Sequence, residues 1–267
     1  AVAPSMTLPL ICITLEGNNA EEILKQAELA TAEGADLIEV RFDNMYVEPV
    51  EVTAKNANGI DETSVELVPR PLDSVNVSES IEQLKKGIEM PVIFTCRSRN
   101  EGGSFPSDEN ARLSILEQAI TSGASWIDLE FSIPPKKRKK LLAAARESGA
   151  KIVASIHDIE STVTTEEMIG LVESSDEMGD IIKLCYQTRH HDDALSIFEA
   201  AWKLKAGEHK YALMGLGIGG DWTRMHAPIL NQALVFTTLK KGFSLADKGL
   251  INVQDLRIAW KMLGHTN

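Results

Sequence analysis

Short apolar runs alternate with longer amphipathic stretches along almost the whole chain. Runs of this length and composition predict buried strands. Eight of them occur, at residues 9–15, 36–42, 91–96, 126–131, 151–156, 180–186, 211–216 and 234–239. We therefore expect eight strands, spread from the beginning of the chain to near its end.

The segments between these runs have helical length and helical patterning. They cover residues 20–33, 108–122, 134–148, 164–175, 192–205 and 253–263. Some begin at a capping residue or an early proline, such as Thr164 and Pro134, and some end at a glycine, such as Gly34. Strict alternation of strand and helix implies parallel strands with helical crossovers. Eight such units predict a closed (β/α)8 TIM barrel in the α/β class, with an open doubly wound sheet as the lesser alternative.

The chain length fits one such barrel. It has 267 residues, and an α/β barrel typically needs about 250. No Pro/Gly/Ser-rich boundary divides the sequence, so we expect a single catalytic barrel over residues 1–267. One stretch breaks the rhythm, between Asp43 and Pro91, and it predicts an enlarged loop or added hairpin around residues 48–78.

Composition narrows the class of protein. The chain is 43% hydrophobic and 25% charged, and no apolar run approaches the roughly 18 residues that a membrane span requires. The first residues lack the features of a secretory signal. The cysteines (Cys12, Cys96 and Cys185) lie far apart inside apolar runs and indicate reduced core thiols. We therefore expect a cytoplasmic protein without membrane contact.

The net charge bears on the choice of ligand. A charge of −12 argues against a broad nucleic-acid surface but leaves room for a local basic pocket that binds an anion. Three motifs could suggest other sites: the glycines Gly215, Gly217 and Gly220, the basic run 136–140 and the cluster 190–193. The position of the glycines argues against a dinucleotide site. Helical context argues against a nucleic-acid site at the basic run and a metal site at the cluster 190–193. We expect no metal and no cofactor.

Reactive groups of an α/β barrel lie at the C-terminal ends of its strands. Alternation along the second strand predicts that Glu39, Arg41 and Asp43 share one face. The other polar residues at predicted strand ends are Arg97, Glu101, Asp128, Glu130, His157, Asp158, Lys183 and Arg224.

Lys183 is the most informative of these residues, because apolar residues flank it on both sides in DIIKLCY. Burial disfavours the cation and favours the neutral amine that imine formation with a ketone requires. His157 ends the preceding predicted strand and suits proton transfer near neutral pH. The alternatives are a lysine paired with a barrel carboxylate and a hydrogen-bonded structural histidine.

Three arginines, Arg41, Arg97 and Arg224, come from different strand ends of an acidic chain. Arginine binds carboxylates in a bidentate manner, so their convergence suggests an anionic substrate. The alternative is a set of internal ion pairs with Glu39, Glu101 and Asp128.

A family resemblance rests on motifs spread over nearly the whole chain. They are EVRFD at 39–43, FTCRSRNEGG at 94–103, IDLE at 127–130, ASIHD at 154–158, IIKLCY at 181–186, the arginine of DWTR at 224, and INVQDLR at 251–257. In this order they resemble type I 3-dehydroquinate dehydratase, the Schiff-base lyase of the shikimate pathway, which leads to chorismate and the aromatic amino acids.

The resemblance implies a role for each site residue. Lys183 would form an imine with the C3 ketone of 3-dehydroquinate, and His157 would remove the C2 proton and return it to the departing C1 hydroxyl. Glu101 and Asp128 would orient and tune His157. Arg224 would hold the substrate carboxylate. The residues expected to contact the ring hydroxyls are Glu39, Arg41 and Arg97.

The sequence departs from the family after the eighth predicted strand. The family has a short lid loop there that bears a serine and a glutamine. This chain instead has the longer GFSLADKGLIN, without a glutamine before Ile251. Ser244 is the candidate replacement for the family's serine, and residues 242–249 are the candidate lid.

Two other functions stay open at this point. A class I aldolase on the same fold would also use a barrel lysine, and a relative with impaired turnover would bind a keto acid without dehydrating it. The expected partner is in each case a small anionic keto acid. The oligomeric state stays open, with a homodimer as one option.

Overall fold

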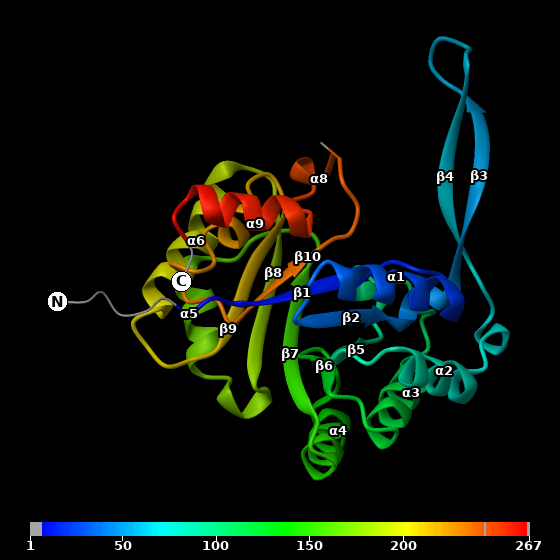
Figure 1. Ribbon diagram of the computed structural model, residues 1–267, viewed down its shortest axis with the longest axis horizontal. Helices are drawn as coiled ribbons and strands as arrows, with labels where there is room; N and C mark the ends of the chain where they lie inside the picture. The colour runs from blue at the N-terminus through cyan, green and yellow to red at the C-terminus, as the bar shows by residue number, and fades with distance from the viewer. Residues whose placement is uncertain (1–6, 243, 266–267) are drawn as a thin grey trace.

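The computed structural model describes residues 7–242 and 244–265. Its main sheet has eight strands, all parallel, in the order β10-β1-β2-β5-β6-β7-β8-β9 (Figure 1). The strands are β1 (Leu10–Leu15), β2 (Leu37–Arg41), β5 (Val92–Thr95), β6 (Trp126–Glu130), β7 (Lys151–Asp158), β8 (Ile181–Thr188), β9 (Tyr211–Gly217) and β10 (Leu234–Thr237). Each lies within two residues of a strand expected from the sequence. The predicted (β/α)8 TIM barrel is confirmed.

A side chain helps to close the barrel between its last two strands. The backbone N–H of Ala233 donates to the carbonyl of Tyr211 at 2.9 Å. The buried amide of Gln232 then pairs with the backbone of Leu213, accepting from its N–H at 2.9 Å and donating to its carbonyl at 2.7 Å. Gln232 therefore provides the hydrogen bonds that a strand partner would otherwise make at this seam.

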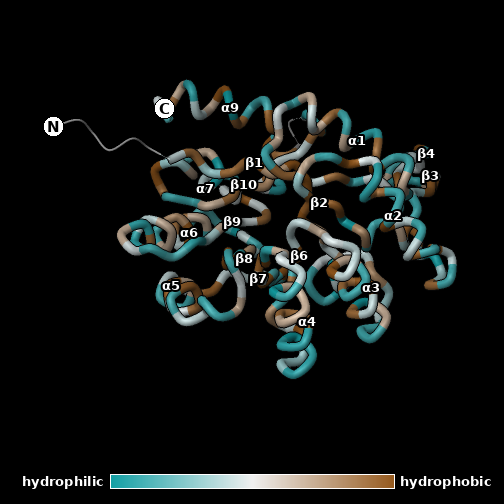
Figure 2. Tube along the Cα trace, turned by 60° about the horizontal axis from the view of Figure 1, so that its bottom comes forward, coloured by the Kyte–Doolittle hydropathy of each residue, from teal (hydrophilic) through white to brown (hydrophobic). Residues whose placement is uncertain are grey.

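Helices pack around the outside of the sheet (Figure 2), apart from the short α8 in the segment after β10. The buried residues of α1, for example, are Ile23, Ala27 and Ala30. The helices are α1 (Ala20–Ala32), α2 (Val77–Gly87), α3 (Glu109–Thr121), α4 (Pro135–Ser148), α5 (Thr165–Glu173), α6 (His191–Leu204), α7 (Trp222–Met225), α8 (Ser244–Asp247) and α9 (Val253–Met262). Local chemistry sets several ends: Thr164 forms a capping box with Glu167, and Gly149 ends α4 in the left-handed conformation with φ of 78°. None of the helices in the described residues is long and apolar enough to cross a membrane.

Alternation along the strands divides the barrel interior into two levels. Apolar side chains fill the lower level, nearer the N-terminal ends, where Leu37, Ile93 and Val153 belong to one buried cluster. Two residues further along these three strands come Glu39, Thr95 and Ser155. Because residues i and i+2 of a strand share a face, the polar side chains lie above a closed apolar floor, at the mouth of the barrel.

A long hairpin leaves the barrel after β2. A 3-10 turn, η1 (Phe42–Tyr46), leads into β3 (Val47–Lys55), which pairs in antiparallel fashion with β4 (Asp61–Pro69). Figure 1 shows this hairpin extending away from the barrel, without a helix or strand packed along it. It occupies part of the stretch for which the sequence predicted an enlarged loop or added hairpin.

Candidate active site

Glu39 lies in the barrel on β2 and is buried. The hydroxyls of Thr14 and Thr95, on the two neighbouring strands, donate to its two carboxylate oxygens at 2.9 Å and 2.8 Å. These bonds fix the carboxylate in one orientation. The ion pair with an arginine that the sequence left open does not form at Glu39 among the described residues.

The alternation argument was wrong for Asp43. The chain leaves the strand after Arg41 and turns through η1, so Asp43 does not continue the face of β2. Arg41 nevertheless binds Asp43 in a bidentate manner at 2.9 Å and 2.8 Å. Asp43 also accepts from the backbone N–H groups of Arg97 and Ser104. Burial opposes ionisation of Asp43, but the Arg41 charge and these hydrogen bonds hold its pKa below the ordinary value.

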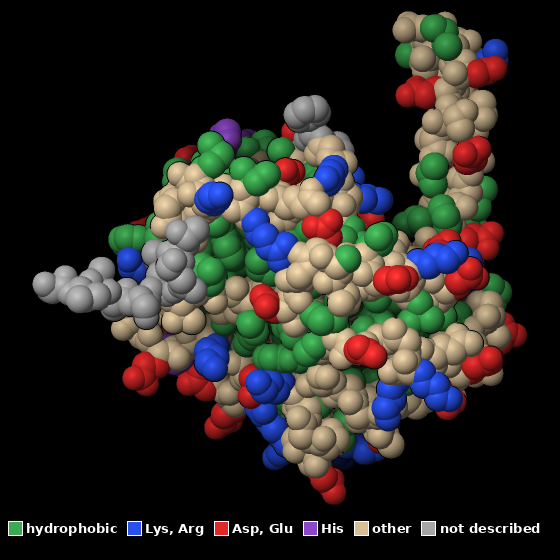
Figure 3. Space-filling view, in the orientation of Figure 1, with side chains coloured by type: hydrophobic (Ala, Val, Ile, Leu, Met, Phe, Trp, Pro, Cys, Tyr) green, Lys and Arg blue, Asp and Glu red, His purple; other side chains and the backbone are tan. Residues whose placement is uncertain are grey.

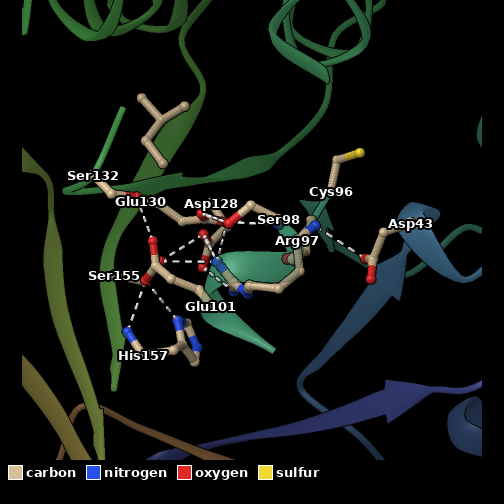
Figure 4. Close-up of polar contacts among 12 residues, drawn as sticks. Asp43, Cys96, Arg97, Ser98, Glu101, Asp128, Glu130, Ser132, Ser155 and His157 are labelled. Atoms are coloured by element: carbon tan, nitrogen blue, oxygen red, sulfur yellow. Dashed lines mark hydrogen bonds and ion pairs between the residues drawn. The ribbon is translucent and has the colours of Figure 1, made fainter. Parts of the chain in front are cut away.

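Arg97, just beyond the end of β5, joins three side chains from neighbouring strands (Figure 4). Its guanidinium binds both oxygens of Asp128, at 2.8 Å and 3.0 Å, and also reaches Glu130 at 3.0 Å. The hydroxyl of Ser155 accepts from Arg97 and donates to Asp128. The predicted internal ion pair between Arg97 and Asp128 is therefore present, and this arginine is already neutralised.

Glycine allows the loop after β5 to place Glu101. Gly102 has φ of +85°, a conformation that favours glycine. A Cβ at Gly103 would lie only 2.1 Å from the carbonyl oxygen of Arg97, so any larger residue would push the loop outward. The loop therefore requires glycine at positions 102 and 103 in order to fold back over the barrel mouth.

Glu101 contacts His157 directly. Its Oε1 accepts from the backbone N–H of His157 at 2.8 Å and lies 3.4 Å from the ring Nδ1 (Figure 4). Its other oxygen accepts from the Ser132 hydroxyl at 2.5 Å. Asp128, which the sequence paired with Glu101 in this role, instead binds Arg97 and Ser155. Any influence of Asp128 on His157 therefore passes through other groups.

Glu130 is the residue whose importance the sequence reasoning missed. It is buried, its charge acts on the carboxyl group of Glu101, and it accepts from the hydroxyl of Ser98 at 2.5 Å. Arg112 reaches it from α3 at 3.2 Å. The only sequence signal was its position two residues after Asp128, which puts both carboxylates on the inner face of β6.

The two glutamates have opposite proton affinities. Burial, together with the charge of Glu130, raises the pKa of Glu101 to about 8. Burial also disfavours ionisation of Glu130, but the charges of Arg97 and Arg112 outweigh it and lower the pKa of Glu130. Near neutral pH the raised pKa of Glu101 favours its protonated form, whereas the lowered pKa of Glu130 favours its carboxylate.

His157 is kept neutral by its surroundings. Burial, reinforced by the charges of Arg97 and Lys183, places its pKa well below the ordinary value. Its side chain is only 9% exposed. A neutral imidazole whose Nδ1 faces Glu101 has its remaining nitrogen free to accept a proton.

Lys183 lies one strand away from His157. It aligns with Ser155 across the β7–β8 pair, one inward position below His157, and it is buried. Its Nζ lies 3.8 Å from the centroid of the Phe236 ring. Within residues 7–242 and 244–265 it forms no ion pair and no hydrogen bond with a carboxylate. The alternative of a lysine paired with a barrel carboxylate does not describe this environment.

Arg224 differs from the other two arginines. Its guanidinium donates to the carbonyl of Phe236 at 2.7 Å and to that of Gly215 at 3.3 Å, across the β9–β10 seam. Its Nε is buried without a hydrogen-bond partner. Arg41 and Arg97 both bind carboxylates, whereas Arg224 binds none in the part of the chain that the structure describes. Trp260 of α9 donates to the Arg224 carbonyl and fixes the backbone there.

The end of the candidate lid touches the glycine-rich loop after β9. A Cβ at Gly249, where φ is +71°, would lie 2.9 Å from the carbonyl oxygens of Gly215 and Gly217. Gly249 therefore lies against the loop that also contacts Arg224. Ser244 begins α8, but its side chain lies outside the described part of the structure.

Comparison with known proteins agrees with this geometry. The family model of type I 3-dehydroquinase matches residues 11–267. A 3-dehydroquinate dehydratase of Methanopyrus kandleri is 27% identical over 255 residues, which are 96% of this chain and 100% of that protein. One from Bacillus subtilis is 27% identical over 265 residues, covering 97% and 93%. The structure of a type I 3-dehydroquinate dehydratase from Clostridium difficile shares the fold, with a TM-score of 0.77, 22% identity and coverage of 96% and 92%. Because the family model spans nearly the whole sequence, the chain belongs to the type I 3-dehydroquinase family.

Proposed function

We propose that this chain converts 3-dehydroquinate to 3-dehydroshikimate and water through an imine on Lys183. One observation carries the proposal: a buried lysine, unpaired in the described part of the chain, lies one strand from a histidine held neutral. An amine in this setting can attack a ketone, and a neutral imidazole can take the proton that the imine makes acidic.

The amine of Lys183 and the imidazole of His157 are sufficient to account for every bond that forms and breaks in this reaction. The amine of Lys183 adds to the C3 ketone, and loss of one water gives a protonated imine. This cation draws electrons from C2, so His157 can remove the C2 proton. The electrons then expel the C1 hydroxyl, which takes that proton and leaves as the second water. Hydrolysis of the imine consumes one water and frees the lysine, so one water is released overall.

The surrounding groups position the reacting atoms. Glu101 accepts from the backbone N–H of His157, and its Oε1 lies 3.4 Å from the ring Nδ1, where it would orient the imidazole. Asp128 holds Arg97 near the same site. Glu39, Arg41 and Arg97 would contact the substrate's ring hydroxyls. All three are held by neighbouring side chains in the absence of substrate, so the mouth of the barrel is preorganised.

Arg224 would bind the carboxylate of the substrate. Among the three arginines it alone, in the described residues, is not neutralised by an acidic side chain, and its buried Nε has an open donor. Ser244 and the rest of segment 242–249 would close over the bound substrate. We further propose that the enzyme is a single barrel domain and works in the cytoplasm, because its three buried cysteines are free thiols.

Product analysis tests the proposal against its two alternatives. Incubation with 3-dehydroquinate should produce a conjugated enone, detected by its near-ultraviolet absorbance and by mass spectrometry as the loss of one water. An aldolase would yield two smaller fragments. A protein that only binds the keto acid would return it unchanged, and either of these results would overturn the proposal.

A further inference from the structure

A cavity lies between helices α2 and α3 and the outer faces of β2 and β5. Figure 1 shows the two helices next to one another on this side of the barrel. The cavity has a volume of about 150 Å³. Its buried apolar lining consists of Val40, Ile81, Leu84, Ile88, Phe94 and Ala119. An apolar cavity of roughly this volume can hold a molecule the size of benzene. This space therefore suits the apolar part of a small molecule.

The outer end of the cavity carries two charged side chains. Lys85, in the last turn of α2, and Glu89, just after that helix, line this end, and both are exposed. Neither belongs to an ion pair in the part of the chain that the structure describes, since the nearby Glu82 pairs with Lys86 at 2.7 Å. Figure 3 shows basic and acidic side chains close together on the surface over α2 and α3. The opening thus presents a cation and an anion to an incoming ligand.

Lys85 reaches across the opening from α2 to the end of α3. Its Nζ lies 3.9 Å from the position that a Cβ on Gly123 would occupy. Gly123 has φ of +90°, which favours glycine, and a side chain there would crowd the lysine amine. The amine therefore lies over the apolar interior, where it can bind an anionic group at the outer end of a ligand.

The cavity is separate from the candidate active site. It opens near Met90 and Ser125, where α2 leads into β5 and α3 leads into β6. These are the N-terminal ends of the strands, whereas the candidate active site lies at the C-terminal ends. Phe94 faces the helices because its neighbour Thr95 points into the barrel. Binding in the cavity is thus independent of the reaction proposed for Lys183.

We propose that this cavity binds a small apolar α-amino acid. The side chain of the ligand enters the apolar interior, its carboxylate meets Lys85 and its ammonium meets Glu89. A ligand with only a carboxylate would be repelled by Glu89, and one with only an amine would be repelled by Lys85, so a zwitterion fits both charges. Burial of the apolar side chain provides most of the binding free energy.

Methyl NMR can locate the ligand in the protein. L-Phenylalanine is the probe, because its benzyl group matches the cavity, and the protein carries labelled methionine methyl groups. Met90 lines the cavity and Met214 lies inside the barrel. The Met90 signal, assigned with Met90→Leu, should shift as the ligand is added, because an aromatic ring then lies beside it. The Met214 signal should not move.

Three analogues test which parts of the ligand are recognised. L-Alanine lacks the ring, 3-phenylpropanoate lacks the ammonium and phenethylamine lacks the carboxylate. Each should bind at least about threefold more weakly than L-phenylalanine, as measured by the Met90 shift, because each loses burial or one charge contact.

Three variants test the residues. Lys85→Ala should weaken binding of L-phenylalanine roughly two- to fivefold, as expected for an exposed charge pair. Lys86→Ala is the matched control, because this neighbouring lysine pairs with Glu82 and does not line the cavity, and it should bind like the wild type. Ala119→Leu fills part of the cavity and should abolish the Met90 shift, with thermal unfolding as a check on its packing.

A Met90 signal that does not move near the solubility limit of L-phenylalanine would overturn the proposal, whether or not the filled variant folds. So would a shift of Met214 alone, which would place the ligand inside the barrel. Equal binding of 3-phenylpropanoate, or equal weakening by Lys85→Ala and Lys86→Ala, would also contradict the proposal.

Discussion

Inside the barrel, Oε1 of Glu101 accepts from the backbone N–H of His157 at 2.8 Å, and the negative charge of Glu130 acts on the same Glu101 carboxyl group. Burial and the charge of Glu130 raise the pKa of Glu101 to about 8, which favours the protonated form of Glu101 near neutral pH. His157 therefore faces a neutral acid near pH 7, and its environment changes when that acid ionises.

This pair predicts a pH dependence of stability. The pKa of Glu101 rises from the ordinary 4.5 to about 8 on folding, so the folded protein binds more protons between these values than the unfolded chain. Protonated Glu101 therefore contributes stability that is fully present below about pH 4.5 and is lost as the pH rises toward 8. Glu130→Gln removes the facing charge, so the pKa of Glu101 should fall and less stability should be lost over this range.

Denaturant unfolding from pH 5 to pH 8.5 measures the difference in unfolding free energy between wild type and Glu130→Gln. As the pH rises, the free energy of unfolding should fall more for the wild type than for Glu130→Gln. Glu109→Gln is the matched control, because Glu109 binds Arg112 from the partly exposed side. Parallel curves for the wild type and Glu130→Gln would show that Glu130 does not set the pKa of Glu101.

His157→Ala should separate imine formation from elimination. The amine of Lys183 remains available, so borohydride should still trap an adduct with 3-dehydroquinate. Turnover should fall by roughly 10²–10⁴, the range for removal of a general acid–base group. Steady-state kinetics and mass spectrometry provide the two readouts. A variant with unchanged turnover would leave His157 as a structural residue.

Arg224→Ala should raise KM for 3-dehydroquinate strongly, corresponding to about 2–3 kcal/mol of lost charge-assisted hydrogen bonding. Arg224→Lys should restore only part of it, because an ammonium cannot reproduce the two-pronged contact. Arg224 also bridges β9 and β10, so thermal unfolding must be compared for all three proteins. Equal KM values for wild type and Arg224→Ala would move carboxylate binding to Arg41 or Arg97.

Segment 242–249 should become protected when the site is occupied. Gly249 already packs against the glycine-rich loop near Arg224, so a trapped adduct should hold the segment closed and slow its proteolysis. The turn between β3 and β4, residues 56–60, is an internal control whose cleavage rate should not change. If cleavage within 242–249 proceeds equally fast in free and trapped protein, the segment is not a lid.

Periodicity was sufficient to predict the barrel because each strand presents one apolar face to the helices and a second to the interior. It was less informative where the chain leaves that pattern. Asp43 lies in a 3-10 turn that alternation cannot anticipate, and the Gln232 side chain closes a seam that no sequence period describes. Both features depend on long-range geometry.

For the candidate site, too, the sequence predicted some features and missed others. Motifs located Lys183 and His157 on neighbouring strands and Glu101 in the loop after β5, but they could not show which carboxylate meets which cation. Asp128 turned out to bind Arg97, and Glu130 turned out to face Glu101. Such pairing depends on side-chain reach across three strands and a helix, including Arg112 of α3, and it emerges only from the folded arrangement.

The imine on Lys183 can be tested by chemical trapping. Wild-type protein is incubated with 3-dehydroquinate, treated with borohydride, digested and mapped by mass spectrometry, in parallel with Lys183→Ala. We predict one reduced adduct on the peptide that contains Lys183 in the wild type and none in the variant, which should also lose nearly all turnover. An adduct on a different lysine, or undiminished turnover in Lys183→Ala, would contradict the account.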